Sequence, residues 1–208
     1  MSKGTLTVIS GFSGAGKGTL MKRLLERHGN YVLSISATTR SPREGELDGR
    51  EYFFKTREEF EEMIARDQLL EYACYVGNYY GTPRSWVEEQ MAAGRDVLLE
   101  IEIQGARNIK KKYPEALLIF VSPPSAQELL RRLTGRGTET PEVIQSRISR
   151  AAEEAQGMDD YDYLLINDDL ECCVGQLDQL IQSAHRRMSE NLEFAGKITE
   201  ELQKMKGE

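Results

Sequence analysis

The chain has 208 residues, of which 39% are hydrophobic and 29% charged, so it has the composition of a folded protein and the length of one α/β domain with inserted segments. Its formal net charge of −7 leaves no basic surplus to neutralise a phosphate backbone, which argues against a general nucleic-acid-binding protein. No stretch approaches the roughly 20 apolar residues of a membrane span, and we expect neither a membrane segment nor a signal peptide. Three cysteines without metal-ligand spacing fit a reduced, cytoplasmic protein.

Residues Gly11–Thr19 read Gly-Phe-Ser-Gly-Ala-Gly-Lys-Gly-Thr, between an expected strand at Leu6–Ser10 and apolar residues at helical spacing. Glycines let successive backbone N–H groups converge on phosphate oxygens, and a helix start adds the positive end of its dipole. The segment is therefore predicted to be a P-loop that binds ATP, with Lys17 directed at the β- and γ-phosphates. Its predicted ATP-binding residues are Gly11, Phe12, Ser13, Gly14, Ala15, Gly16, Lys17, Gly18 and Thr19.

One position of this segment departs from the general P-loop pattern. Gly18 follows Lys17, where most P-loops have the serine or threonine whose hydroxyl contacts Mg²⁺, and Thr19 stands one position later. The arrangement Gly-Lys-Gly-Thr is typical of some small-molecule kinases. We therefore expect Mg²⁺ to be held largely by phosphates and water, and we assign no side chain as a metal ligand.

Strand and helix patterns alternate along the chain, which predicts an α/β fold with a mostly parallel core sheet. After the first strand, the expected core strands are Tyr31–Ser36, Asp96–Ile103, Ala116–Val121 and Tyr163–Ile166. The near-continuous apolar character of residues 117–121 suits a strand that is covered on both faces.

Several helix starts are marked by capping patterns. Capping boxes are expected at Thr56-Arg-Glu-Glu59, Ser85-Trp-Val-Glu88 and Ser125-Ala-Gln-Glu128, and Thr140 precedes a proline suited to the first helical position. The stretch from Glu171 to Lys206 is predicted to be a packing helix whose amphipathicity weakens toward a frayed end. Its apolar stripe comprises Val174, Leu177, Leu180, Ile181, Ala184 and Met188.

Two segments do not follow the core pattern. Residues 37–84 combine arginines and aromatic residues with strand and turn character, and we expect them to form an inserted subdomain for the second substrate. Residues 124–154 carry several arginines around Gly135-Arg-Gly137, a predicted hinge, and suit a lid that screens phosphate charge from water. The expected organisation is core 1–36, insert 37–84, core 85–123, lid 124–154, and core with a C-terminal helix 155–208.

The first insert carries a set of donors suited to a phosphate monoester. Arg40 and Arg43 lie three residues apart with a proline between them, and Tyr52 follows downstream. Arginine forks and a phenol hydroxyl can together bind the oxygens of one phosphate group.

The strings in this insert closely resemble those of guanylate kinases. They are Ser36-Ala-Thr-Thr-Arg40-Ser-Pro-Arg43-Glu-Gly-Glu, Gly49-Arg-Glu-Tyr52-Phe, Glu71-Tyr-Ala and Gly77-Asn-Tyr-Tyr80-Gly-Thr82. The resemblance covers nearly the whole chain, because it continues through Ile101-Glu-Ile-Gln-Gly105 and Gly135-Arg-Gly-Thr-Glu139 to Asn167-Asp-Asp169. It implies a three-layer P-loop NTPase fold with an inserted GMP-binding subdomain and a helical lid, and the ATP-dependent phosphorylation of GMP (and dGMP) in purine nucleotide metabolism.

The resemblance also implies roles for individual residues. The GMP phosphate would be held by Ser36, Arg40, Arg43, Tyr52 and Tyr80. The guanine ring would be bound by Glu71, Gly81, Thr82 and Glu102, with Glu100 in the same acidic cluster. The transferring phosphoryl group would be surrounded by Lys17, Arg132, Arg136 and Arg147, and the adenine edge by Asn167 and Asp168. Arg150 receives no role and is expected to be an exposed surface residue.

The chemistry of Glu71 supports a guanine site independently. Guanine presents N1–H and N2–H₂ as adjacent donors, and an ionised carboxylate can accept from both. Adenine has an acceptor at N1 and would leave this carboxylate poorly paired, at a cost of about 1–3 kcal/mol. In many relatives the acidic positions at the strand end are aspartates, whereas this chain has Glu100 and Glu102, so the role of each stays open.

Three other functions fit these residues less well. The Gly-Lys-Gly-Thr string would also suit an adenylate kinase, but Glu71 and the string from Ser36 to Glu46 oppose it. A non-catalytic guanylate-kinase-like interaction domain would typically lack the P-loop lysine or the lid arginines, which are present here. A GTPase is disfavoured because no Asn-Lys-x-Asp motif occurs. The expected partners are GMP and ATP, and the oligomeric state is left open.

Overall fold

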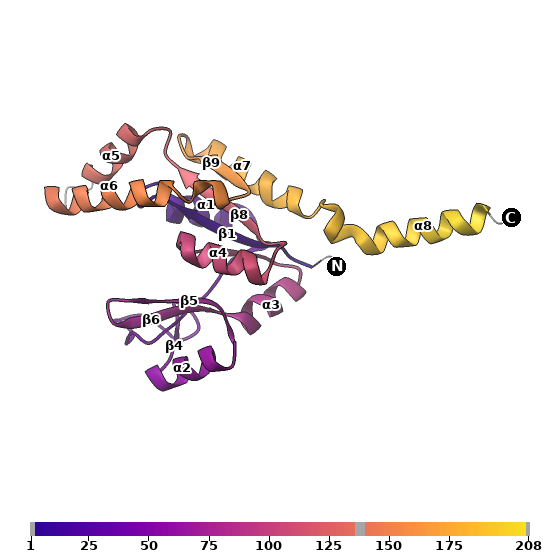
Figure 1. Cartoon of the computed structure of the whole chain (residues 1–208), viewed down its shortest axis with the longest axis horizontal. Coiled ribbons are helices and arrows are strands. Elements are labelled where there is room, and N and C mark those ends of the chain that lie inside the picture. Colours follow the sequence, from indigo (N-terminus) through magenta and orange to yellow (C-terminus); the bar gives the residue numbers. More distant parts are fainter. Residues whose placement is uncertain (1–2, 136–139, 207–208) are drawn as a thin grey trace.

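The computed structural model describes residues 3–135 and 140–206, and these form two sheets with helices around them (Figure 1). The core sheet is parallel throughout, and its strand order is β2-β7-β1-β8-β9. The bounds are Leu6–Gly11 for β1, Tyr31–Leu33 for β2, Asp96–Glu100 for β7, Leu117–Ser122 for β8 and Tyr163–Ile166 for β9. The fold class is therefore as predicted.

Two of the five predicted strands were too long at their carboxyl ends. The β2 strand stops at Leu33 and not at Ser36, and β7 stops at Glu100 and not at Ile103. The carbonyl of Ile101 accepts a hydrogen bond of 2.7 Å from the Ser10 hydroxyl, and Ile103 already begins the next helix. The prediction followed the apolar residues, which continue along the chain after the backbone has left the sheet.

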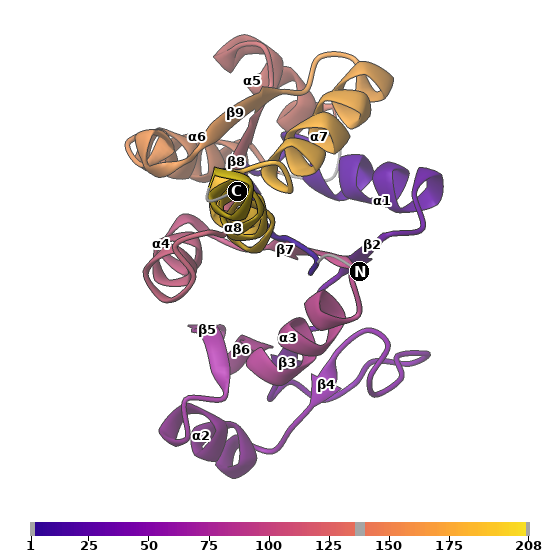
Figure 2. The same ribbon diagram turned by 90° about the vertical axis from the view of Figure 1, so that its right-hand side faces the viewer.

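Helices cover both faces of the core sheet, which makes three layers (Figures 1 and 2). Along β1, Ile9 packs in the apolar cluster with helices α1 (Lys17–Arg27) and α7 (Leu170–Ala184). Its neighbour Val8 packs in the opposite cluster with α3 (Arg84–Ala92) and α4 (Ile103–Lys112). Alternate residues of a strand face opposite sides, so a sheet covered twice needs the near-continuous apolar runs seen in the sequence.

The second sheet lies between the second and third core strands in the sequence and forms a separate lobe in Figure 1. Its strand order is β4-β3-β6-β5, and its hydrophobic centre is the buried Phe60 of α2 with Ala37 and Leu69. The bounds are Ala37–Thr38 for β3, Phe53–Phe54 for β4, Arg57–Ala65 for α2, Leu69–Tyr75 for β5 and Asn78–Pro83 for β6.

The capping pattern at α2 is confirmed and the one at α3 is wrong. The Glu59 amide donates to the Thr56 hydroxyl at 3.1 Å, and the Thr56 amide donates to the Glu59 carboxylate at 2.7 Å. Helix α3 begins at Arg84 with Pro83 as its N-cap, because β6 runs directly into the helix and leaves Ser85 inside its first turn.

The segment 124–154, predicted to be a lid, contains α5 (Ala126–Thr134) and α6 (Pro141–Ala155). Ser125 caps α5 through its hydroxyl, but the Glu128 carboxylate bonds to arginines and does not complete a capping box. Thr140 is the N-cap of α6, without a side-chain cap bond. Arg136 and most of the predicted hinge fall within 136–139, outside the described residues.

The C-terminal segment is a single packing helix only as far as Ala184. The predicted stripe is confirmed for Val174, Leu177, Ile181 and Ala184, which are buried, and Leu180 packs against the same cluster. The chain then turns through His185, whose carbonyl accepts from Asn191 at 2.9 Å, and Met188 is 67% exposed. This turn contains the short helix η2 (Met188–Asn191) and leads into α8 (Leu192–Lys206). Another short helix, η1 (Met158–Asp160), precedes β9 earlier in the chain. No helix in the described ranges is long and apolar enough to span a membrane.

Candidate active site

The turn between β1 and α1 requires glycine at several positions. Gly11, Gly14 and Gly16 have φ angles of 147°, 89° and 89°, a region that side chains with a Cβ rarely adopt. A Cβ at Gly11 would also lie 2.1 Å from the carbonyl oxygen of Val121. These glycines let the backbone pass from the strand end directly into α1, so that its first N–H groups are available at one concave turn.

Lys17 lies at the start of α1, and its side chain returns over this turn. The ammonium Nζ donates to the carbonyl oxygens of Gly11 at 2.8 Å and Phe12 at 3.2 Å. Burial lowers the pKa of the ammonium, and the nearby charges of Glu100 and Glu154 act in the opposite sense. A partly desolvated cation interacts more strongly with a phosphate than one in water.

Two adjoining cavities meet at the carboxyl end of β7. The cavity beside the P-loop has a volume of 670 Å³, and the cavity beside the second sheet has a volume of 330 Å³. Both are lined by Tyr75, Glu100, Ile101 and Glu102. Two ligands can therefore occupy separate cavities and still approach one another across this shared wall.

The smaller cavity contains a carboxylate held in a fixed position. The Glu71 Oε1 atom accepts a hydrogen bond of 2.7 Å from the hydroxyl of Thr82, which is fully buried. Burial raises the pKa of the Glu71 carboxyl, and the charge of Glu102 acts in the same direction. Because the Thr82 hydroxyl donates its hydrogen bond to Glu71, the structure supports a role for this threonine in orienting the Glu71 carboxylate.

The predicted phosphate clamp is assembled only in part. The Arg40 guanidinium donates to both oxygens of Glu46 at 2.9 and 3.0 Å and lies 5.3 Å from the centre of the Tyr52 ring. The Tyr52 and Tyr80 rings pack edge to face at 6.0 Å. The smaller cavity is lined by Ser36, Tyr52, Tyr80 and Gly81, among others. Arg43 is exposed on the following loop, where its backbone N–H donates to Glu46 at 2.7 Å.

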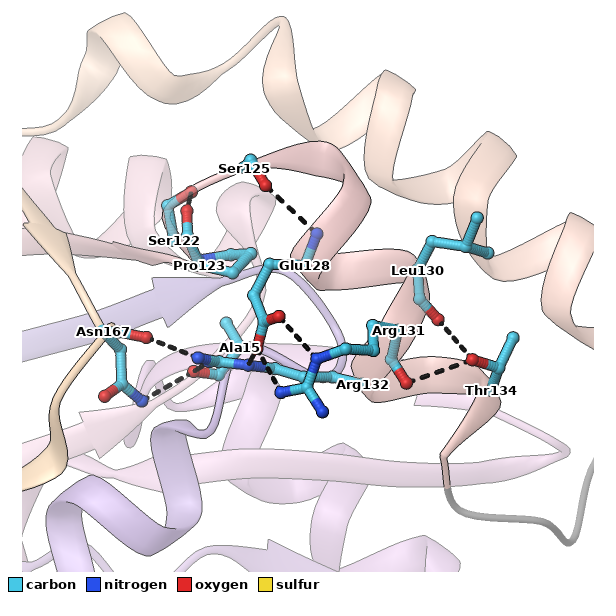
Figure 3. Close-up of polar contacts among 10 residues, drawn as sticks. All are labelled: Ala15, Ser122, Pro123, Ser125, Glu128, Leu130, Arg131, Arg132, Thr134 and Asn167. Atoms are coloured by element: carbon cyan, nitrogen blue, oxygen red, sulfur yellow. Dashed lines mark hydrogen bonds and ion pairs between the residues drawn. The ribbon is translucent and has the colours of Figure 1, made fainter.

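A polar network joins α5, in the predicted lid segment, to the P-loop (Figure 3). The Arg132 guanidinium donates to the carbonyl oxygens of Asn167 at 2.8 Å and Ala15 at 3.5 Å. The side-chain amide of Asn167 donates to the same Ala15 oxygen at 2.8 Å, and Glu128 accepts from Arg132 Nε at 2.7 Å. Asp168 is exposed beside this network. These contacts make Arg132 and Asn167 supports of the P-loop backbone, whereas Arg147 lines the larger cavity.

This network predicts a role for Glu128 in ATP binding. The adjacent Arg131 and Arg132 guanidiniums lower the pKa of the Glu128 carboxyl to about 2, so it is ionised at neutral pH. The change Glu128→Gln removes the charge that orients Arg132, and we expect the KM for ATP to rise roughly three- to tenfold, with a smaller change in kcat. Steady-state kinetics at saturating second substrate measures both constants.

Arg131→Ala is the matched control for this prediction. Arg131 also pairs with Glu128, but its side chain is 74% exposed, whereas that of Arg132 is 21% exposed and donates to the Ala15 and Asn167 carbonyls. The KM for ATP should stay within about twofold of the wild type, in the range of ordinary surface changes. If both variants raised the KM for ATP equally, the loss of an ion pair to Glu128, and not the orientation of Arg132, would be the cause.

Sequence reasoning missed two charged residues of the larger cavity, Arg150 and Glu154. Arg150 is exposed, as expected, but its guanidinium lies 3.0 Å from the Glu102 carboxylate and 3.2 Å from Glu154. Burial raises the pKa of the Glu154 carboxyl. The spacing of Arg147, Arg150 and Glu154 places them on one face of α6, and this periodicity could have grouped them.

A glycine-rich turn and lysine at the carboxyl edge of a parallel sheet, next to a second polar cavity and an arginine-bearing helical segment, define a P-loop nucleotide-binding protein. The family model for guanylate kinase matches residues 3–184. A guanylate kinase of Lactococcus lactis subsp. lactis (strain IL1403) is 48% identical over 191 residues, which are 92% of this chain and 93% of the relative. The crystal structure of a guanylate kinase from Anaplasma phagocytophilum superposes with a TM-score of 0.69 at 31% identity, over 90% of this chain and 89% of the other. The chain belongs to the guanylate kinase family.

Proposed function

We propose that the chain transfers the γ-phosphoryl group of ATP to GMP, giving ADP and GDP, with GMP in the smaller cavity and ATP at the P-loop. The observation that carries this proposal is the oriented carboxylate of Glu71 in a 330 Å³ cavity that shares a wall with the P-loop cavity. A base acceptor on one side and a phosphate cradle on the other are what a nucleoside-monophosphate kinase needs.

Guanine selection rests on Glu71. When the carboxylate is ionised it accepts from guanine N1–H and N2–H₂, while the Thr82 hydroxyl holds one of its oxygens. An adenine ring would set its N1 lone pair against the carboxylate and leave a part-buried charge without a donor. Glu102 lies in the same cavity lining and is proposed to contact the base as well.

The phosphate of GMP is proposed to bind Arg40, Tyr52 and Tyr80, with Ser36 and Arg43 completing the set. Glu46 holds the Arg40 guanidinium by two hydrogen bonds, which restricts its rotamers before substrate arrives. Phosphoryl transfer requires an in-line acceptor oxygen and no covalent intermediate, so positioning the phosphate is the main task of these residues.

The triphosphate is proposed to bind the turn Gly11–Thr19 with Lys17 at its β- and γ-phosphates. Arg147, from α6, lies in the same cavity lining, and Arg136 is proposed to join it from outside the described residues. Charge that develops on the moving group would then meet fixed cations in a site with little water. The lid segment 124–154 and the insert 37–84 are proposed to exclude water and so suppress hydrolysis of ATP.

The residues present fit an Mg²⁺ ion carried by ATP. Within residues 3–135 and 140–206, no group of three or more His, Cys, Asp or Glu side chains could hold a metal ion. Glu100 and Glu102 nevertheless present carboxylate oxygens, the ligands that Mg²⁺ prefers, in the lining of the P-loop cavity. Glu100, which is not assigned to the base, would hold the hydrated ion together with the phosphates, and the ion would neutralise charge on the triphosphate.

A parallel assay of ADP formation with GMP, AMP, CMP and UMP tests the proposal. We expect GMP to exceed the other three by at least about 100-fold in kcat/KM, because a site built to accept from guanine donors rejects rings that lack them. Comparable rates with AMP would place base selection elsewhere. No turnover with any of them would favour a non-catalytic interaction domain.

The clamp predicts a selective loss in the Arg40→Ala variant. The change removes the cation that faces the GMP phosphate and leaves the Glu46 carboxylate without its cationic partner, so GMP binding loses an attraction and gains a repulsion. We expect the KM for GMP to rise roughly 10- to 100-fold while the KM for ATP changes little. Arg57→Ala, at an exposed arginine of α2 paired with Glu61, should leave both constants unchanged. A parallel rise in both KM values for Arg40→Ala would contradict the assignment.

A further inference from the structure

Gly105 lies in the first turn of α4 and lines the smaller cavity. The positive φ angles of this chain occur at other glycines, and Gly105 has an ordinary helical conformation that any residue adopts. A glycine within a helix is less stable than an alanine at the same place, because its backbone loses more freedom on folding. The backbone therefore gives no reason for a glycine at this position, and the space around it has to supply one.

Two side chains lie where a side chain at position 105 would begin. A Cβ at Gly105 would lie 3.2 Å from Ile101 Cδ1 and 3.3 Å from Glu71 Oε2. The Ile101 atom is the free end of a flexible side chain, which can rotate away. The Glu71 carboxylate is held at its other oxygen, Oε1, by the hydroxyl of the buried Thr82. It cannot withdraw without weakening that bond, so Glu71 Oε2 is the atom that a side chain at this position would crowd.

The position of Gly105 matters because of the shape of the smaller cavity. Helix α4 packs beside β5 (Figure 1), and the cavity is lined by Tyr72 and Gly81 from the β5–β6 hairpin and by Gln104 and Gly105 from α4. A flat guanine ring donates through one edge, so it has to meet both oxygens of the Glu71 carboxylate nearly in their own plane. A methyl group 3.3 Å from Oε2 would cover that oxygen from the α4 side and shift it from this plane.

We propose that Gly105 is a specificity-determining residue for guanine, because the lack of a side chain at this position keeps Glu71 Oε2 open to the N–H donors of the base. Thr82 and Gly105 then act on the two oxygens of one carboxylate. The Thr82 hydroxyl fixes Oε1, and the open space at Gly105 leaves Oε2 accessible. The inference rests on the proposed function, since it requires GMP in the smaller cavity.

The variant Gly105→Ala tests the inference through opposite effects on binding and stability. We expect the KM for GMP to rise roughly 5- to 30-fold while the KM for ATP stays within about twofold, because only the base contact is crowded. The melting temperature should equal or exceed that of the wild type, because alanine favours the helix. The matched control is Gly175→Ala, at a half-buried glycine of α7 where a Cβ would have open space in the described part of the chain. It should leave both KM values unchanged.

The double variant Glu71→Gln, Gly105→Ala shows whether both positions act on one contact. The Thr82 hydroxyl needs an acceptor, so the amide oxygen of Glu71→Gln should take the place of Oε1 and its NH₂ group the place of Oε2. The contact that Gly105 keeps open is then already lost. Adding Gly105→Ala should therefore raise the KM for GMP by no more than about twofold beyond Glu71→Gln alone, since changes at one shared contact are not additive.

The outcomes separate this inference from the proposed function. An unchanged KM for GMP in Gly105→Ala, an equal rise in Gly175→Ala, or losses that multiply in the double variant would each overturn the role of Gly105. A melting temperature of Gly105→Ala well below that of the wild type would do the same, because the Cβ would then clash with the fold itself. Comparable kcat/KM values of the wild type for GMP and AMP would instead overturn the proposed function.

Discussion

Lys17→Ala is expected to lower kcat roughly 100- to 1,000-fold, because it removes a cation aimed at the group on which charge develops in the transition state. The lysine lies in the lining of the P-loop cavity, and its ammonium rests on the carbonyls of Gly11 and Phe12. An ammonium already held over the P-loop needs to move little to donate to the oxygens of a bound phosphate. The loss should therefore fall mainly on kcat, with a smaller effect on the KM for ATP.

The same variant should not lose stability. Burial lowers the pKa of the Lys17 ammonium, so the folded state disfavours its charge, and the hydrogen-bond partners that it leaves are two carbonyls beside an open cavity. We expect a melting temperature equal to or above that of the wild type, as is common where a residue serves function at a cost to the fold. Kinetics and thermal melting on one preparation therefore separate a chemical loss from an unfolded protein.

Lys111→Ala is the control for the charge change. Lys111 is an exposed lysine of α4, and neither cavity lining includes it. Its kcat should equal that of the wild type. If Lys17→Ala retained near-wild-type turnover, phosphoryl transfer at this P-loop would not depend on the lysine, and the assignment of the catalytic cation would have to move to the lid arginines.

Local patterns were sufficient for the P-loop and for the layers of the core. The requirement for glycine at Gly11 and Gly16 is a backbone property, and a Cβ on either would meet Val121 or Asn167. The strands β1 and β8 are buried on both faces, and a continuous apolar run in the sequence is the pattern that predicts such a strand. These features depend on neighbours in sequence or on a regular repeat, and this is why sequence could predict them.

Features that depend on contacts between distant segments could not be predicted in this way. The break after Ala184 occurs where His185 meets the buried Asp96 at 2.7 Å, a contact that helical periodicity does not contain. The Arg150–Glu102 ion pair exists only because α6 lies over the end of β7, and the early end of that strand is itself set by the Ser10–Ile101 contact. For the site, the resemblance named Glu71 and Thr82 as base contacts, and the structure adds that one orients the other.

Glu71→Gln is expected to raise the KM for GMP roughly 100-fold while the KM for ATP stays within about twofold. The change replaces a carboxylate oxygen with an NH₂ group, so one of the two donors of guanine faces a donor and a part-buried polar pair is lost. Glu71→Asp keeps the charge and should recover part of the affinity, because only the reach of the carboxylate changes. Glu89→Gln, at an exposed glutamate of α3, is the control and should leave both constants unchanged.

The pH dependence of these variants distinguishes a base contact from a merely structural carboxylate. Burial and the charge of Glu102 raise the pKa of Glu71, so this carboxyl takes up its proton at a higher pH than an ordinary glutamate. The protonated form resembles the glutamine variant, since it presents a donor where guanine requires an acceptor. As pH falls through the raised pKa, the KM for GMP of the wild type should therefore climb toward that of Glu71→Gln. The ratio of the two KM values at each pH is the quantity to measure, because the ionisation of the GMP phosphate affects both proteins and cancels. A ratio that stays constant with pH, or a Glu71→Gln variant that raises the KM for ATP as much as that for GMP, would mean that Glu71 supports the fold and does not read the base.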